Sequence, residues 1–200
     1  DGADWILTGN KMWITNANHA DIALIWAHTP EGIGGFLVER DRRGFSTAPV
    51  RGKWSLRASD TGELVLDAVR VPDANRLPGA RGLRAPLSCL NEARYGIAWG
   101  AVGAAAECYR VALEYALARQ QFKRPIASFQ LVQAKLVDML TEITKGQTLV
   151  HQLGRLKDRG INETPLVSLA KRNNVAMALE VARAAREILG AAGITDEWPV

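Results

Sequence analysis

The spacing of apolar residues changes near residue 80, and this change limits the folds that the chain can adopt. Before that point, short apolar runs recur between turns that contain Gly or Pro, a pattern typical of β-sandwiches and barrels. From Pro86 onwards, apolar residues follow helical spacing over long stretches. We therefore predict an α+β chain with two domains, residues 1–80 and residues 81–200.

The first domain is predicted to contain several strands. Residues 5–7 and 12–14 flank Thr8–Lys11, which indicates a hairpin. Further strands are expected at residues 22–27, 36–38 and 64–66, the last leading on to 69–72. A turn-rich segment at Leu77–Gly79 marks the expected boundary with the helical domain.

Three long helices are predicted in the second domain. The first covers Leu87–Arg119, the second runs from a cap at Ser128 to about Gly160, and the third from Thr164-Pro165 to about Gly190. Residues 121–127 connect the first two. Such helices with short links form most of an antiparallel four-helix bundle.

Two features of these helices predict how they pack. Small residues repeat on one face of the first helix at Gly96, Gly100 and Gly103, which would permit close helix approach. The second helix is expected to bury an apolar seam that consists of Leu136, Leu140, Ile143, Val150 and Leu153.

Composition argues against several classes of protein. The net charge of +4 is mild and the basic residues are interleaved with acidic ones, which disfavours a nucleic-acid partner but suits an anionic ligand. No apolar run reaches the roughly 20 residues of a membrane helix, and no signal segment opens the sequence. The three histidines lack ligand spacing, so we expect no metal. Cys89 and Cys108 are expected to be buried thiols in a reducing compartment.

An aromatic residue and a hydroxyl lie close together at the end of the first strand region. Trp13 and Thr15 are two residues apart, so regular alternation would put both on one face of the strand. An indole there could flank an isoalloxazine ring while the hydroxyl bonds to its edge. A tryptophan in this position is more often part of the core, and that alternative stays open.

A second set of residues surrounds the connector between the first two helices. Arg119 could grip a diphosphate with its guanidinium fork, Gln130 could assist, and Phe122 could cover an adenosine. The simpler alternative is a salt bridge and a solvated amide. Gly190–Gly193 could be an ordinary helix end or a place where the backbone approaches a ligand. Together with Trp13 and Thr15, this set suits a flavin cofactor.

Several longer segments resemble the acyl-CoA dehydrogenase family, and within it the glutaryl-CoA dehydrogenase branch. The Trp-Ile-Thr segment is typical of the whole superfamily, whereas Gly52–Ser59 and Cys89–Gly100 are similar to the branch. Further similar segments are 136–144, 153–158, 167–174 and 193–197. The resemblance covers essentially the whole sequence.

This resemblance implies a fold and a set of binding residues. The chain would be the later part of the family's β-domain followed by the first three helices of its C-terminal helical domain, in a homotetramer. FAD would be the cofactor. Its isoalloxazine would contact Trp13, Ile14 and Thr15, and its adenine dinucleotide part, in a neighbouring subunit, would contact Arg119, Phe122, Gln130, Glu187, Ile188, Leu189, Gly190 and Ala191. The acyl-CoA site would be lined by Leu87, Ser88, Cys89, Leu90, Asn91, Glu92, Ala93 and Arg94, with Arg94 near the reacting carboxylate.

The sequence departs from the family pattern at some of these positions. Lys123 stands where the family usually has glycine, and Ala191-Ala192 replaces a Gly-Asn pair. Ala93 occupies a position at which some relatives carry the catalytic base, and Glu92 lies about 100° away around the helix. No catalytic residue is therefore expected in this chain. The family's basic glutamate, in a Tyr-Glu-Gly-Thr segment, is expected beyond Val200.

The implied activity is FAD-dependent oxidation of glutaryl-CoA at its α and β carbons, with decarboxylation to crotonyl-CoA and electrons passed to an electron-transfer flavoprotein. Two alternatives stay open: an acyl-CoA dehydrogenase for another straight or branched chain, and a non-catalytic flavoprotein or assembly module. The Ala- and Arg-rich composition favours a bacterial cytoplasmic protein over one of the mitochondrial matrix.

Overall fold

The computed structural model describes residues 4–161 and 164–200, and the chain divides into two compact units. The first unit comprises residues 1–88 and contains the sheets, and the second comprises residues 89–200 and contains the bundle. The boundary falls within the first turns of the longest helix, α1 (Arg84–Ala118).

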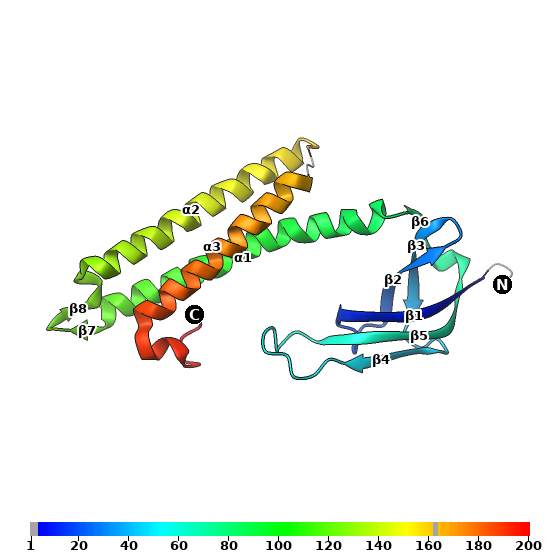
Figure 1. The fold of residues 1–200 in the computed structure, drawn as a ribbon, viewed down its shortest axis with the longest axis horizontal. Coiled ribbons are helices and arrows are strands. Elements are labelled where there is room, and N and C mark those ends of the chain that lie inside the picture. Colours follow the sequence, from blue (N-terminus) through cyan, green and yellow to red (C-terminus); the bar gives the residue numbers. More distant parts are fainter. Residues whose placement is uncertain (1–3, 162–163) are drawn as a thin grey trace. The chain divides into compact units, whose positions relative to one another are not determined.

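The sheet unit consists of two three-stranded antiparallel sheets. One has the order β1-β5-β4 and the other the order β2-β3-β6 (Figure 1). The strands are β1 (Asp4–Thr15), β2 (Ile22–Thr29), β3 (Gly32–Glu39), β4 (Phe45–Pro49), β5 (Thr61–Pro72) and β6 (Arg76–Arg81).

Both sheets contribute to one apolar core. Phe36 and Val38 of β3 are completely buried, as are Val69 and Val71 of β5. Residues on alternate positions of each strand point to the same face, so two such faces packed together bury every second residue. The expected sandwich or barrel piece is confirmed.

The hairpin expected around Thr8–Lys11 is wrong. β1 continues through this segment and pairs with β5 from Asp4 opposite Pro72 to Thr15 opposite Thr61. The turn-forming residues produce a bulge instead, because the register shifts between Leu7 and Gly9. The partner strand β5 is long enough to pair with β1 throughout, and this tertiary pairing overrides the local turn preference.

Two strands were not expected from the sequence. β4 is short, and β6 contains the turn-rich segment Leu77–Gly79. Proline has no backbone N–H to donate to a neighbouring strand. Pro78 is tolerated in β6 because this strand lies at the edge of its sheet and pairs with β3 on one side only.

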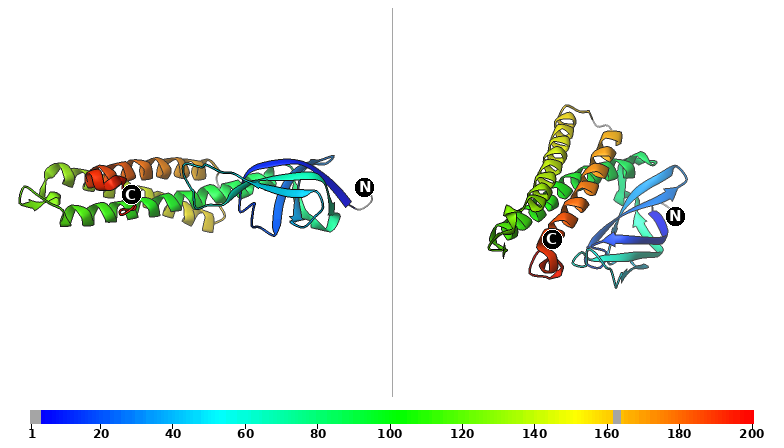
Figure 2. Two further views of the ribbon diagram at one scale, coloured as in Figure 1. Left: turned by 90° about the horizontal axis from the view of Figure 1, so that it is seen from below. Right: turned by 60° about the vertical axis from the view of Figure 1, so that its left-hand side comes forward.

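The three predicted helices are confirmed. α1, α2 (Gln130–Asp158) and α3 (Thr164–Leu189) pack around one apolar core, and each runs in the direction opposite to the helix before it (Figures 1 and 2). Short elements join and end them: the two-residue strands β7 (Gln120–Gln121) and β8 (Arg124–Pro125), and the 3-10 helices η1 (Asp73–Asn75), η2 (Ile126–Ser128) and η3 (Gly190–Ile194).

One buried polar side chain links all three helices. Asn174 of α3 donates from Nδ2 to the carbonyl of Ala98 in α1 at 3.1 Å and to that of Gly146 in α2 at 3.2 Å. Gly146 is required at this contact, because a Cβ there would lie 2.9 Å from Asn174 Oδ1. These bonds fix the helices in one register.

The predicted seam of α2 is correct except at one position. Leu136, Ile143, Val150 and Leu153 are buried, but Leu140 is 48% exposed and Met139 is buried instead. Position 139 lies three residues after 136 and four before 143, which keeps it on the helix face that the seam follows.

Three other expectations about the helices fail. A Cβ added at Gly96, Gly100 or Gly103 would meet no atom within 4 Å, so no described helix approaches this face closely. Ser128 does not cap α2: its hydroxyl donates to the Pro125 carbonyl, and Phe129 is the N-cap residue. Cys89 is exposed rather than buried, while Cys108 is half-buried and burial raises the pKa of its thiol.

Within the residues that the structure describes, no helix combines the length and apolar character needed to traverse a bilayer.

Candidate functional site

The end of β1 is distorted so that it presents an aromatic side chain. The register with β5 shifts between Lys11 and Ile14, and Trp13 in this bulge has a φ of 64°. Such a conformation is strained for a tryptophan, and strain of this kind is retained mainly at functional positions. The indole is 67% exposed.

Trp13 and Thr15 both line a cavity of about 500 Å³ in the sheet unit. They share it because of the bulge rather than through the regular alternation expected from the sequence. The Thr15 hydroxyl has no hydrogen-bond partner among residues 4–161 and 164–200. Ile14 packs against the sandwich core, so only its backbone is available to a ligand. The other lining residues are Gly52, Lys53, Trp54, Ser55, Leu56, Ser59 and Thr61.

The cavity therefore joins two segments that lie about forty residues apart in the sequence. Gly52–Ser59 resembles one branch of a family, and that resemblance implies no role for it. Here it forms the side of the cavity that faces Trp13 and Thr15. Its composition alone contains no signal for this role, because the contact depends on how β5 pairs with β1.

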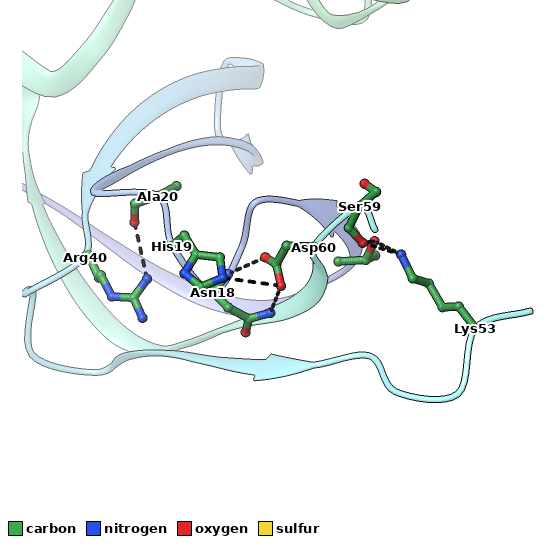
Figure 3. A network of polar contacts seen from close by, with 8 residues as sticks. Asn18, His19, Ala20, Arg40, Lys53, Ser59 and Asp60 are labelled. Atoms are coloured by element: carbon green, nitrogen blue, oxygen red, sulfur yellow. Dashed lines mark hydrogen bonds and ion pairs between the residues drawn. The ribbon is translucent and has the colours of Figure 1, made fainter. Parts of the chain in front are cut away.

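A polar network holds the turn after β1 against the start of β5 (Figure 3). The amide of Asn16 donates to the Asp60 carbonyl at 3.1 Å, and Asn18 donates to the Asp60 carboxylate at 3.2 Å from its amide and 2.8 Å from Nδ2. The hydrogen bond from the Asn18 side chain lowers the pKa of Asp60. His19 Nε2 lies 3.9 Å from the same carboxylate.

Lys53 binds the loop that follows it (Figure 3). Its Nζ donates to the carbonyls of Leu56 at 2.9 Å and Ser59 at 2.5 Å, and to Thr61 Oγ1 at 2.7 Å. The cavity is thus shaped by hydrogen bonds within the unit.

The second candidate region is the short hairpin between α1 and α2. Gln120 pairs with Pro125 and Gln121 with Arg124, which leaves Phe122 and Lys123 as the two turn residues, at φ of 52° and 66°. Two-residue hairpins favour such positive φ values, although glycine or asparagine usually adopts them.

Arg119 stands at the base of this hairpin, where its carbonyl accepts from the amide of Ile126 at 2.9 Å. Its guanidinium makes no hydrogen bond or ion pair with the described part of the chain. Gln130 is the first residue of α2 and is also exposed. An anion could therefore approach both side chains.

Phe122 is held at the tip of the hairpin by aromatic contacts. Its ring is 85% exposed and meets Phe129 edge-on with the centroids 6.0 Å apart. The guanidinium of Arg124 lies 4.2 Å from the Phe129 centroid. Sequence reasoning missed Phe129 and Arg124, and only their closeness to Phe122 could have suggested them.

The end of α3 offers mostly backbone to a ligand. Ile188 and Leu189 are buried in the bundle core, and Glu187 forms an ion pair with Lys135. Gly190 has a φ of 59° and begins η3, where Ala191 is exposed.

The residues expected to line an acyl-CoA site form the first turns of α1. Arg94 is half-buried and, within the described ranges, its guanidinium has no hydrogen-bond or ion-pair partner. Glu92 is paired with Lys157 at 2.7 Å, and Asn91 is buried. Leu87, Ser88, Cys89, Leu90 and Ala93 are exposed. A free guanidinium beside apolar side chains suits a ligand with both a negative charge and an acyl chain.

Family comparison divides the chain in a similar way. Residues 1–69 match the acyl-CoA dehydrogenase middle domain, and residues 80–200 match the acyl-CoA dehydrogenase C-terminal domain.

Individual relatives point in the same direction. The mitochondrial isovaleryl-CoA dehydrogenase of Solanum tuberosum is 36% identical over 98% of this chain, and the match covers 49% of that protein. The crystal structure of glutaryl-CoA dehydrogenase from Mycobacterium smegmatis is 58% identical over the whole chain, with a TM-score of 0.96, and 51% of it is covered. A Mycobacterium smegmatis glutaryl-CoA dehydrogenase in complex with FADH2 is 51% identical, with a TM-score of 0.97, over the whole chain and 52% of that structure. The chain thus spans about half the length of the relatives it matches.

Proposed function

We propose, from the premise that the chain belongs to the acyl-CoA dehydrogenase family, that the whole protein binds FAD and oxidises an acyl-CoA between its α and β carbons. The observation that carries this proposal is the strained bulge at Trp13. It aims an exposed indole into the same cavity as the unpaired Thr15 hydroxyl. An aromatic wall beside a free hydrogen-bonding group fits the face and edge of an isoalloxazine ring.

The residues present fit FAD at both of its ends. In the sheet unit, Trp13 would flank the isoalloxazine and Thr15 would donate to its edge. Arg119 of a neighbouring subunit would grip the diphosphate, with Gln130 assisting and Phe122 against the adenosine. When bound, FAD supplies the hydride acceptor. We propose that the protein assembles as a homotetramer, as the family resemblance implies, so that one site draws on two subunits.

The end of α3 would contribute to the same site chiefly through its backbone. Ile188 and Leu189 are buried, so their role is limited to peptide groups, and Gly190 with its positive φ allows close approach. Glu187 and Ala191 would border the ligand.

The substrate proposed is glutaryl-CoA, with decarboxylation to crotonyl-CoA. The 58% identity to a glutaryl-CoA dehydrogenase supports it, as does the free guanidinium of Arg94, which suits a carboxylate. Residues 87–94 would line the acyl-CoA site. The catalytic base is expected in the family's Tyr-Glu-Gly-Thr segment, outside this chain.

A second candidate substrate is a branched or other straight acyl-CoA. The similarity to isovaleryl-CoA dehydrogenase at 36% identity favours this alternative. In either case we propose that electrons pass to an electron-transfer flavoprotein and that the protein works in a bacterial cytoplasm.

The test is anaerobic bleaching of the flavin in the full-length protein. Glutaryl-CoA should bleach the flavin faster than pentanoyl-CoA, which has the same chain length without the carboxylate, or isovaleryl-CoA, and the product should be crotonyl-CoA by chromatography. Arg94→Met should slow bleaching by glutaryl-CoA by about tenfold or more, the loss expected for one charge-assisted hydrogen bond, and affect pentanoyl-CoA little. If isovaleryl-CoA bleached the flavin faster than glutaryl-CoA did, the proposed substrate would be a branched acyl-CoA instead of glutaryl-CoA. A flavin that no acyl-CoA bleaches would refute the enzymatic function.

A further inference from the structure

We propose that Lys53 is a positioning residue for the cofactor, acting through the loop that forms one side of the cavity at Trp13. The inference rests on the proposed function, since the ligand in that cavity is taken to be the isoalloxazine. Lys53 lies in a segment that resembles the family, but it is not among the site residues that this resemblance implies.

The ammonium of Lys53 is fully engaged by protein oxygens. An ammonium has three N–H donors, and here three acceptors surround it: the carbonyls of Leu56 and Ser59 and the hydroxyl of Thr61, at 2.5–2.9 Å. No donor remains for a ligand. Lys53 therefore acts on the cavity by holding its walls, which distinguishes it from a residue that binds the cofactor directly.

The loop has little else to hold it. Trp54 is 99% exposed and Leu56 is 79% exposed, so neither side chain anchors the loop by apolar packing. Leu56 also has a φ of 49°, a conformation that costs energy for a residue with a Cβ. One backbone bond, from the amide of Ser59 to the Leu56 carbonyl at 3.0 Å, closes the turn. Thr61 Oγ1 also donates to the Ser59 carbonyl at 3.3 Å, and the amide of Val50 donates to the Thr61 carbonyl at 2.9 Å. The ammonium of Lys53, with its three hydrogen bonds, is the most highly connected of these restraints on the wall.

The same ammonium connects the two sides of the cavity. Thr61, which it binds, is paired with Thr15 across the β1–β5 ladder. Ser59, which it also binds, precedes Asp60, and Asp60 is tied to Asn16 and Asn18 just beyond Thr15 (Figure 3). Loss of the ammonium should therefore change how Trp54 and Leu56 stand relative to Trp13, while the sandwich core stays intact.

The experiment measures FAD affinity of the full-length protein after removal and return of the flavin. Lys53→Ala should weaken FAD binding by about tenfold or more, because hydrogen bonds to charged groups are the strong ones. Arg51→Ala is the matched control: it removes a positive charge from the neighbouring exposed loop position and should leave the affinity within about twofold, the range of a weak surface-charge effect. Thr61→Val removes one acceptor of the ammonium and the 3.3 Å bond from Thr61 Oγ1 to the Ser59 carbonyl, and it should have a smaller effect than Lys53→Ala. Its added cost in the Lys53→Ala background should be smaller than its cost in the wild type.

Chemical rescue separates positioning from a general loss of stability. Propylammonium matches the atoms that Lys53→Ala removes, so millimolar propylammonium should restore both the affinity and the visible spectrum of the bound flavin. Tetramethylammonium, which has the charge but no N–H donor, should restore neither. Wild-type affinity in Lys53→Ala, or a weakened variant that propylammonium does not restore, would overturn the role of Lys53. A wild-type protein that binds no FAD would instead refute the proposed function itself.

Discussion

Around the cavity of the sheet unit the charged groups of Lys53 and Asp60 are already bonded to other protein groups, whereas at the hairpin of the helical unit Arg119 has no partner in the described ranges. Lys53 and Asp60 both serve to hold backbone in place around Trp13. Phe122 instead lies in the two-residue turn of the hairpin, and Arg119 lies exposed at the base of the hairpin. We infer that the first region contributes shape to cofactor binding and the second contributes charge, so the two should respond differently to salt.

The largest effect is expected from removing the unpaired charge. Arg119→Ala should weaken FAD binding by about 10–100-fold at low ionic strength, because it deletes charge-assisted bonds to the diphosphate. The loss should shrink as salt is added, since salt screens an exposed charge. Titration of the apoprotein with FAD at two salt concentrations measures this. Arg172→Ala, another exposed arginine with no partner in the described residues, is the control and should change little.

The next effect concerns the bundle alone. Asn174→Val should lower the free energy of unfolding of the helical unit by about 2 kcal/mol, because two buried carbonyls lose their donor. Arg172→Ala, at an exposed position of the same helix with no partner in the described residues, should cost much less. Denaturant unfolding followed by circular dichroism at helical wavelengths measures the difference. Equal losses in the two variants would show that the buried bonds do not hold the helices together.

How far the sequence alone predicts these two regions depends on the range of the interactions involved. The helices of the bundle could be predicted because their apolar period and end signals are local. The one error in the predicted seam of α2 was Leu140, which is exposed while the adjacent Met139 is buried. The bulge at Trp13 could not, because it arises from pairing with β5, almost fifty residues away in sequence. The role of Lys53 could not be predicted for the same reason, because Lys53 is linked to Thr15 only through Thr61 and the pairing of β1 with β5. The sequence identifies Trp13 and Thr15 as candidate ligand-binding side chains, but it predicts neither the exposure of Trp13 nor the bulge that brings the two residues to one cavity.

A smaller effect of opposite sign is expected at the hairpin tip. Lys123→Gly should raise the free energy of unfolding by about 1 kcal/mol, because glycine adopts the positive φ of 66° without a Cβ penalty. The same substitution at Lys145, in the interior of α2, should lower it by about 1 kcal/mol. Thermal unfolding of the two variants compares them. A destabilised Lys123→Gly would mean that the lysine makes contacts that outweigh its backbone strain.

The smallest effect is a pH dependence at the cavity. Hydrogen bonding from Asn18 lowers the pKa of Asp60 in the folded protein, so its stabilising contribution is present at neutral pH and is lost as the pH falls through the folded pKa, below about pH 4. Asp60→Asn should therefore be slightly less stable than the wild type at pH 7, and the difference should narrow at pH 3. Denaturant titrations at the two pH values test this, and a constant difference would exclude the proposed ionic contribution.

The most direct test compares FAD with FMN in the full-length protein, because FMN lacks the AMP half of the cofactor and so has one phosphate in place of the diphosphate. Affinities for both flavins would be measured in the wild type, Trp13→Ala and Arg119→Ala. If one cofactor spans both regions, Trp13→Ala weakens FAD and FMN by the same factor, while Arg119→Ala weakens FAD far more than FMN. Equal effects of Arg119→Ala on the two flavins, or a wild-type protein that prefers FMN, would contradict a site shared between the sheet unit and the hairpin.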